Sequence, residues 1–353
     1  MKQRNGHRTL NFESPLLSVG ALVLALIFAA IIILIAGYNP LESYAALLAG
    51  AFSSISNIAT TLGTATPLIF AGLSVSLAYR AGFLNVAVES QLIVGALAAA
   101  LVGLIPNIPA ILHIPLCLLA AGAAGGSIGV LSAFLKRKLQ VSELIITVML
   151  NYIMAYLVEY LVSGPFAAES RMVRTNAMQD SARIPLLVPN NRLSSGIFLA
   201  LACALFLWWL LNRTRVGYEM RACGFNATAA ETGGIRIYNR IYLAMLISGA
   251  LAAFGGAVEA MGVHGYYINS MVTGYGYDGL TIAIMGNFSS SGCLLTSLLF
   301  GALRAGSSNM NRSTSIPGEF ITVLQALVIL FVSTPRLILF LKSWIVRRRK
   351  KEA

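Results

Sequence analysis

The amino-acid sequence predicts an all-α polytopic membrane protein of about ten transmembrane helices, in two inverted halves with broken helices near the midplane. The first observation is composition: 57% of the residues are hydrophobic and only 11% are charged, against about 25% charged in globular domains. The second is a series of apolar runs of about 20 residues, the length that crosses a bilayer. The third is that the basic residues stand in short groups beside those runs, as the positive-inside rule describes.

Charge and cysteine usage limit the classes of partner and site. The net charge of +12 comes from basic residues that flank apolar runs, so the expected partner is a lipid bilayer with an anionic inner surface, and no nucleic acid. The four cysteines are dispersed and form no CxxC pair. Neither a disulfide framework nor a metal site is predicted, and no catalytic nucleophile with its base is visible.

The first half of the chain, residues 15–162, contains five predicted spans. The run after the basic N-terminus is too long for a signal-peptide core and is expected to stay as the first span. Pro67 and Gly72 interrupt the second, while glycines at i,i+4 spacing in the fourth predict close approach of a neighbouring helix. Lys136–Lys138 closes the fourth and marks the cytoplasmic side. The five runs cover residues 15–36, 55–79, 86–105, 111–135 and 141–162.

The second half, residues 193–335, follows a polar outer loop at residues 163–192. Residues 263–280 show no helical period, and a basic amphipathic tail at residues 336–353 is expected to lie along the inner surface. Together the runs predict about ten spans in the plasma or inner membrane, with both termini cytoplasmic. Clear spans are predicted at 193–211, 241–262 and 316–332, and apolar pieces too short to cross alone at 281–288 and 293–306.

The two halves are expected to run in opposite directions across the membrane, because the first starts from inside and the second from outside. Each carries an irregular segment with one acidic residue: Arg80–Gln91 contains Glu89, and Gly274–Gly286 contains Asp278. Broken segments at matching places in two repeats indicate a transport site near the midplane.

Polar residues at membrane depth are candidates for the solute path, because a centred charge costs about 2.5–3.5 kcal/mol there. The tyrosines among them could stack on a ring of the solute or form an interface belt. The two acids could instead hold arginines, with Arg80 and Arg304 nearest in the sequence. The path residues predicted from the sequence are Asn85, Glu89, Asn151, Tyr275, Tyr277 and Asp278.

The longest polar run between two apolar segments is residues 212–240, which carries five arginines and two glutamates. Within it, the alanine-rich stretch Met220–Ala230 predicts a short helix, and Gly233 with Gly234 predicts its end. A compact amphipathic helix in a cytoplasmic loop favours docking of a partner protein. The alternative is a solvated basic loop that only fixes the topology.

Three stretches resemble those of permease subunits of ABC importers: Ala78–Gln91 (AYRAGFLNVAVESQ), Val141–Tyr152 (VSELIITVMLNY) and Thr214–Ile235 (TRVGYEMRACGFNATAAETGGI). The likeness extends over nearly the whole chain. It is to the ribose-type, branched-chain-type permease family and, within it, to the branch associated with nucleoside uptake. Ser90 stands where that branch is expected to have a glycine, and an alanine follows Asn226 in place of a proline.

The resemblance implies a division of labour among subunits. Such permeases pair with an identical or paralogous permease, an extracytoplasmic solute-binding protein delivers the solute, and a separate ABC ATPase subunit docks against the cytoplasmic loop. The chain has no Walker A motif (GxxxxGK followed by Ser or Thr), so ATP is expected in the ATPase, and the chain itself is expected to need no cofactor and to be no enzyme. By the resemblance, the residues that couple to the ATPase are Gly217, Arg221, Ala222, Gly224, Asn226, Ala229, Ala230 and Gly234.

The alternative function is an ion-gradient-driven secondary transporter of a small polar solute, which also suits inverted halves and buried acids. Such a carrier gives no reason for an alanine-rich docking helix. The expected solute is a nucleoside, with a simple sugar as the second choice, and the residues leave open whether the paired permease is identical.

Overall fold

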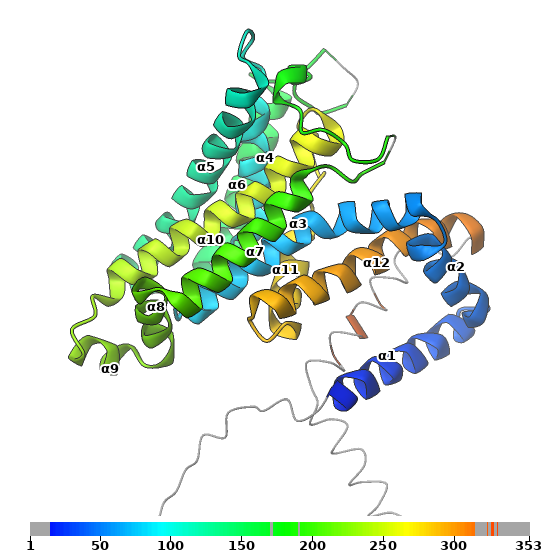
Figure 1. Ribbon diagram of the computed structural model, residues 1–353, viewed down its shortest axis with the longest axis horizontal. Helices are drawn as coiled ribbons and strands as arrows, with labels where there is room; N and C mark the ends of the chain where they lie inside the picture. The colour runs from blue at the N-terminus through cyan, green and yellow to red at the C-terminus, as the bar shows by residue number, and fades with distance from the viewer. Residues whose placement is uncertain are drawn as a thin grey trace, which may run out of the picture. The chain divides into compact units, whose positions relative to one another are not determined.

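The structure is a computed structural model that describes residues 15–169, 172–189 and 191–314, together with Val323, Ala326, Leu327 and Leu330. All regular elements among these residues are helices (Figure 1), which confirms the all-α class. The chain divides into one unit of residues 1–45 with 310–353 and a second unit of residues 46–309. The basic N-terminus, the C-terminal tail and most of the last predicted span lie outside the described residues.

In the first unit, α1 (Pro15–Ile35) matches the predicted first span. The following helix, α2 (Pro40–Phe52), starts with proline and carries Glu42 in its first turn, both of which are favoured at a helix N-terminus. The hydroxyl of Tyr44 donates a hydrogen bond to the carbonyl of Leu26 at 2.6 Å and so joins the two helices.

The second unit is organised around α3 (Ile55–Arg80), whose residues between Ala59 and Ala78 are almost all buried. A helix that is apolar on every face is buried on every face, and the helices α4 (Val88–Val102), α7 (Gly196–Arg213), α10 (Ile237–Glu259) and α11 (Tyr275–Met285) pack around it (Figure 1). Pro67 lies inside α3 without ending it, so the predicted interruption is wrong. Neighbouring helices allow a proline inside a membrane helix because they satisfy the freed backbone groups.

Glycines bring α5 (Ala110–Leu139) close to α10. A Cβ atom on Gly125 or Gly129 would collide with the carbonyl of Gly249 or of Met245 on α10. Close packing of small residues is a main source of attraction between helices in lipid. The close approach predicted from the glycine spacing is therefore confirmed, and α10 is the neighbour.

Five described helices are long and apolar enough to cross a bilayer: α3, α5, α6 (Glu143–Ser163), α7 and the run Ile237–His264. In that run α10 continues through a π-helical turn at Ala260–His264. The helices α4 and α11 have 15 and 11 residues, too few to cross alone. The all-helical membrane fold is thus present, while the exact total of ten spans stays a prediction.

The helix α12 (Ser290–Thr314) has 25 residues, so the prediction of a short piece at 293–306 is wrong. Polar residues conceal this helix in a hydropathy profile. Several of them contact other protein groups: the Asn309 amide, for example, donates to the Ala46 carbonyl at 3.0 Å. A helix that satisfies its polar residues against neighbouring backbone needs no continuous apolar run.

A short helix follows an irregular segment in each half of the second unit. The helix α4 begins after residues 81–87, and α11 begins after residues 265–274. Each has its acid in the first turn, Glu89 in α4 and Asp278 in α11. Most of the stretch predicted to be irregular, Gly274–Gly286, is therefore helical. The opposite orientation of the two halves stays a prediction.

The polar loop at residues 163–195 and the loop at residues 212–240 lie at opposite ends of α7 (Figure 1). The basic end of α5 belongs to the second of these ends, because the Arg137 guanidinium lies 4.4 Å from the ring centroid of Tyr238. At the other end, the loop pairs with the irregular segment 265–274: the Thr175 amide donates to the Tyr267 carbonyl at 2.9 Å. Basic residues from both halves thus share one face.

Candidate functional site

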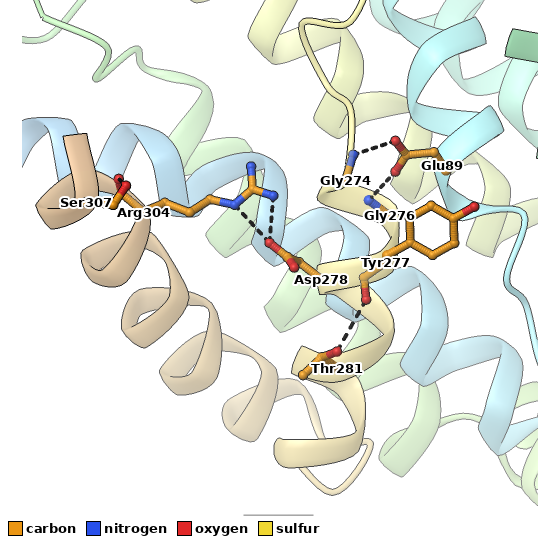
Figure 2. Close-up of polar contacts among 8 residues, drawn as sticks. All are labelled: Glu89, Gly274, Gly276, Tyr277, Asp278, Thr281, Arg304 and Ser307. Carbon is orange, nitrogen blue, oxygen red and sulfur yellow. Dashed lines mark hydrogen bonds and ion pairs between the residues drawn. The ribbon is translucent and has the colours of Figure 1, made fainter. Parts of the chain in front are cut away.

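The Glu89 carboxylate caps the N-terminus of α11. Its Oε1 accepts the backbone N–H of Gly274 at 2.6 Å, and its Oε2 accepts that of Gly276 at 2.7 Å (Figure 2). The first N–H groups of a helix lack partners within the helix and favour a negative charge beside them. A Cβ atom on Gly276 would collide with the Glu89 backbone, so glycine is needed for this approach. Glu89 therefore fastens α4 to α11.

Asp278, the second predicted path acid, is paired with Arg304 of α12. The Arg304 Nε and Nη2 atoms lie 2.9 Å and 2.8 Å from one Asp278 oxygen (Figure 2). The same guanidinium lies 4.3 Å from the ring centroid of Tyr275, which is 5% exposed. The alternative in which each acid holds an arginine thus describes Asp278, while Glu89 bonds to backbone and Arg80 donates to the Phe288 carbonyl at 2.5 Å.

The two predicted path asparagines brace the irregular segment before α4. Asn151 accepts the Ser90 N–H at 3.0 Å and donates to the Val86 carbonyl at 2.9 Å. Asn85 accepts the N–H of Ala87 at 3.0 Å. Its amide nitrogen donates to two further side chains, those of Gln91 and Ser248. Both asparagines are buried and hold structure.

Of the predicted path residues, only Tyr277 is broadly exposed, at 46%. The other five make contacts between α4, α6, α11 and α12, and so belong to the packing around the two irregular segments. They are Asn85, Glu89, Asn151, Tyr275 and Asp278. Their role in contacting a solute stays a prediction. A sequence shows that a polar residue lies at membrane depth and cannot show which neighbour satisfies it.

A cavity of about 230 Å³ lies between α4, α6 and the segment 265–274. Its walls combine aromatic rings with polar groups, and none of the six path residues predicted from the sequence lines it. The signal was present as tyrosines four residues apart on α6, Tyr152 and Tyr156, beside Glu159. The lining residues are Ile93, Tyr152, Ala155, Tyr156, Glu159, Tyr267, Asn269, Ser270 and Thr273.

The loop at residues 212–240 contains two helices, α8 (Arg215–Phe225) and α9 (Ala227–Thr232). The single helix predicted over Met220–Ala230 is therefore wrong. Asn226 separates the two because its backbone is extended and its side chain accepts the Ala229 N–H at 3.0 Å. Asparagine is a strong N-cap residue for this reason.

Two glycines hold α8 against the membrane helices. A Cβ atom on Gly217 would collide with the Leu210 carbonyl at the end of α7, and one on Gly224 would collide with the Arg80 carbonyl at the end of α3. Ala222 is partly buried and Ala230 buried, while Gly224, Asn226, Ala229 and Gly234 are exposed. Phe225 is 88% exposed at the tip of the loop, an aromatic side chain that the sequence prediction did not select.

Two charged residues in α8 have contrasting environments. Hydrogen bonds from Arg215 at 2.8 Å and Arg240 at 2.5 Å hold the pKa of the Glu219 carboxyl below its usual range. Arg221, by contrast, has a buried Nε atom without a hydrogen-bond partner among the described residues. A buried donor that lacks an acceptor costs about 1–3 kcal/mol.

The described residues contain no group of three or more His, Cys, Asp or Glu side chains placed to hold a metal ion. All four cysteines are free thiols.

Residues 54–333 match a protein family described as the branched-chain amino acid transport system / permease component. The chain belongs to this family. It is 37% identical to the guanosine ABC transporter permease protein NupP of Bacillus subtilis, over 91% of this chain and 93% of NupP. It is 31% identical to the nucleoside ABC transporter permease protein NupB of Lactococcus lactis, over 89% of each chain. The glucose ABC transporter permease protein TsgB13 of Haloferax volcanii is 30% identical, over 92% of this chain and 88% of TsgB13.

The protein is therefore a multi-pass permease subunit of an ABC importer in the plasma membrane. A secondary transporter is not favoured, because the relatives are permease subunits of ABC transporters for nucleosides and sugars. Membership of the family implies an ATPase and a solute-binding protein as partners. In a permease subunit, the exposed face of α8 and α9 is the candidate surface for the ATPase.

Proposed function

We propose that this permease subunit imports nucleosides. The observation that carries the proposal is the 37% identity to the guanosine permease NupP over more than nine tenths of both chains, supported by 31% identity to the nucleoside permease NupB. A sugar is the second candidate, favoured by the 30% identity to the glucose permease TsgB13.

The paired permease is proposed to be a paralogue. Three organisms each have two permease proteins named for one solute class, and this chain matches one of each pair better. It is 37%, 31% and 30% identical to NupP, NupB and TsgB13 over 89–92% of its length. It is 27–28% identical to NupQ, NupC and TsgC13 over 69% of its length. A chain of the second type is the expected partner.

The ATPase is proposed to dock on α8 and α9. Gly217 and Gly224 fix α8 against the ends of α7 and α3, while the partly buried Arg221 and the exposed Phe225 are the charged and aromatic candidates for contact. Because α8 contacts the end of α3, a movement of the docking surface is expected to be transmitted to α3, around which the other helices pack. ATP is expected to bind and to be hydrolysed in the docked subunit only.

The loop end at residues 212–240 is proposed to face the cytoplasm, with both termini on the same side. The basic end of α5 lies there as well, beside Tyr238, and basic residues concentrate on the cytoplasmic side. The loop at residues 163–195 then faces outward, toward the solute-binding protein.

Uptake by a strain that lacks its own nucleoside and sugar importers tests the solute. The strain expresses this permease with its ATPase, its paralogous permease and its binding protein, and receives labelled guanosine, uridine, ribose or glucose. ATP-dependent uptake of a nucleoside that excess glucose does not inhibit supports the proposal. Uptake of glucose or ribose alone contradicts it, and full uptake without the paralogue contradicts the proposed pairing.

A further inference from the structure

The cavity between α4, α6 and the segment 265–274 has the walls of a site for a small ring-bearing solute. Tyr152 and Tyr156 stand one helical turn apart on α6 with more than half of each side chain exposed, and the buried Tyr267 lines the cavity from the irregular segment. Asn269, Ser270 and Thr273 of the same segment add short polar groups to the lining. Ligand sites combine aromatic walls with a few convergent polar groups in this way, and typically measure about 300–1,000 Å³. At about 230 Å³ this cavity is smaller than that range and has room for one small molecule at most.

Glu159 is the charged residue among those that line the cavity. It makes no hydrogen bond or ion pair with any described residue, whereas Glu89 and Asp278 are both engaged. Its side chain is exposed and lies near the end of α6, so its claim to a role rests on the cavity that it lines. A carboxylate without a protein donor is free to accept donors from a solute.

The cavity lies near the end of the molecule proposed to face outward. Glu159 is four residues before Ser163, where α6 ends, so it lies about 6 Å from that end at 1.5 Å per residue. Tyr267 is hydrogen-bonded to Thr175 of the outward loop through the Thr175 N–H at 2.9 Å and the Thr175 hydroxyl at 3.0 Å. A solute released at the outer face would meet this cavity before reaching the framework around Glu89.

We infer that this cavity is the first solute site of the permease, where a nucleoside stacks its base on Tyr156 and donates hydrogen bonds to Glu159. The inference rests on the proposed function, since it names the residues that receive that solute. Bases stack on aromatic side chains, and ring N–H, amino and ribose hydroxyl groups are donors that a carboxylate accepts strongly. A free sugar has hydroxyls and C–H faces but no aromatic base, so loss of the Tyr156 ring is expected to weaken nucleoside binding more than sugar binding.

Guanosine uptake by cells that express the complete importer tests the site. Glu159→Gln keeps the shape and loses the charge, and Tyr156→Ala removes the ring. Each is expected to raise the KM for guanosine about tenfold, the equivalent of one charge-assisted hydrogen bond or one stacked base. Tyr156→Phe keeps the ring and is expected to stay within twofold of wild type.

Two substitutions serve as matched controls. Tyr160→Ala removes an exposed ring one turn further along α6, outside the cavity, and Glu169→Gln removes an exposed charge from the outward loop. Both are expected to leave the KM unchanged. An unchanged KM in Glu159→Gln and Tyr156→Ala overturns the site while leaving the nucleoside importer intact. Failure of the wild-type importer to take up any nucleoside overturns the proposed function instead.

Labelling in intact cells gives a second, independent measurement if a variant transports poorly. A cysteine in place of Tyr156 is expected to react with an impermeant maleimide from outside, and saturating guanosine is expected to slow that reaction at least fivefold. A cysteine in place of Tyr160 is expected to react at the same rate with and without guanosine. If guanosine leaves the reaction rate at position 156 unchanged, as it does at position 160, the site is overturned.

Discussion

The ring of Tyr79 lies flat on the ring of Phe288, with the centroids 3.6 Å apart and 11° between the planes. The neighbouring Arg80 donates from its Nε to the Phe288 carbonyl at 2.5 Å. These contacts join the end of α3 to the turn between α11 and α12. Because Gly224 of α8 lies directly against the Arg80 carbonyl, the candidate docking surface touches the same junction.

Gly224→Ala is expected to impair transport by forcing α8 away from this junction. The added Cβ would collide with the Arg80 backbone, and overpacking of this kind costs about 1–3 kcal/mol. Gly233→Ala is the matched control, since its nearest neighbours lie at 3.4 Å or beyond. Uptake and membrane abundance are measured together. Equal uptake in the two variants would show that the α8 contact is dispensable.

Arg221→Glu is expected to insert into the membrane at normal abundance and to abolish uptake, because the docking surface would repel an acidic partner group. Arg221 is partly buried on α8, the helix proposed for docking. Arg236→Glu alters an exposed arginine of the same loop and is expected to keep most of the uptake. Copurification of the ATPase with each variant reports docking directly, and wild-type copurification with Arg221→Glu would exclude this arginine from the interface.

The sequence predicted most of the helices because bilayer-spanning runs carry a strong apolar signal. The bounds of α3, α5 and α6 lie within four residues of the predicted runs. The glycine spacing in α5 also predicted its close approach to a neighbour. The helix α12 was predicted too short because its polar residues lower its hydropathy, while contacts that no hydropathy profile contains pair several of them, such as Arg304 and Asn309, with other protein groups.

The polar residues show where sequence reasoning reached its limit. A costly acid at membrane depth has two explanations, a functional contact or a structural partner, and the sequence favours neither. In the structure, Glu89 accepts hydrogen bonds from backbone N–H groups at the start of α11, and Asp278 is paired with Arg304. It leaves Glu159 without a partner among the described residues and places it in a cavity. Only the three-dimensional arrangement separates these cases.

Asp278→Asn is expected to lower membrane abundance more than it lowers the activity of each remaining molecule. It leaves Arg304 without a counter-ion, and breaking a buried pair costs about 3–5 kcal/mol. The cost here is expected to be lower, since the Arg304 side chain is 26% exposed. The double variant Asp278→Asn with Arg304→Gln removes both charges and is expected to recover abundance. Quantitative immunoblotting of membranes, with uptake per molecule, measures both effects.

Glu89→Gln is expected to destabilise the start of α11. One of the two N–H groups now bonded to the carboxylate would face the amide NH₂ of the new side chain, and an unsatisfied buried donor costs about 1–3 kcal/mol. Faster hydrogen exchange of the first α11 amides in the purified variant would report the lost cap. Normal exchange there combined with reduced guanosine uptake would restore Glu89 to the solute path.

The ion pairs of Glu219 with Arg215 and Arg240 predict that the stability of the loop at residues 212–240 depends on pH. Because Arg215 and Arg240 lower the pKa of Glu219, the cluster stabilises the loop fully above the pKa of an unpaired glutamate, about 4.3. That stabilisation is lost as the pH falls through the lowered folded-state pKa. Exchange of α8 amides, corrected for intrinsic rates, is expected to be constant from about pH 6 to 8 and to accelerate below about pH 4. Glu219→Gln is expected to remove the pH dependence.

Cysteine labelling tests the assignment of the two faces. Asn176 and Ala227 are exposed, and they belong to the two loops at opposite ends of α7 (Figure 1). If basic residues mark the cytoplasmic face, Asn176→Cys reacts with an impermeant maleimide in intact cells, and Ala227→Cys reacts only after permeabilisation. The wild-type chain supplies the background, because Cys117, Cys223 and Cys293 are buried and Cys203 is only partly exposed. Reaction of both introduced cysteines from the same side would contradict the opposite placement of the two loops. Reaction of Ala227→Cys alone from outside would invert the orientation and remove the ATPase surface from the cytoplasm.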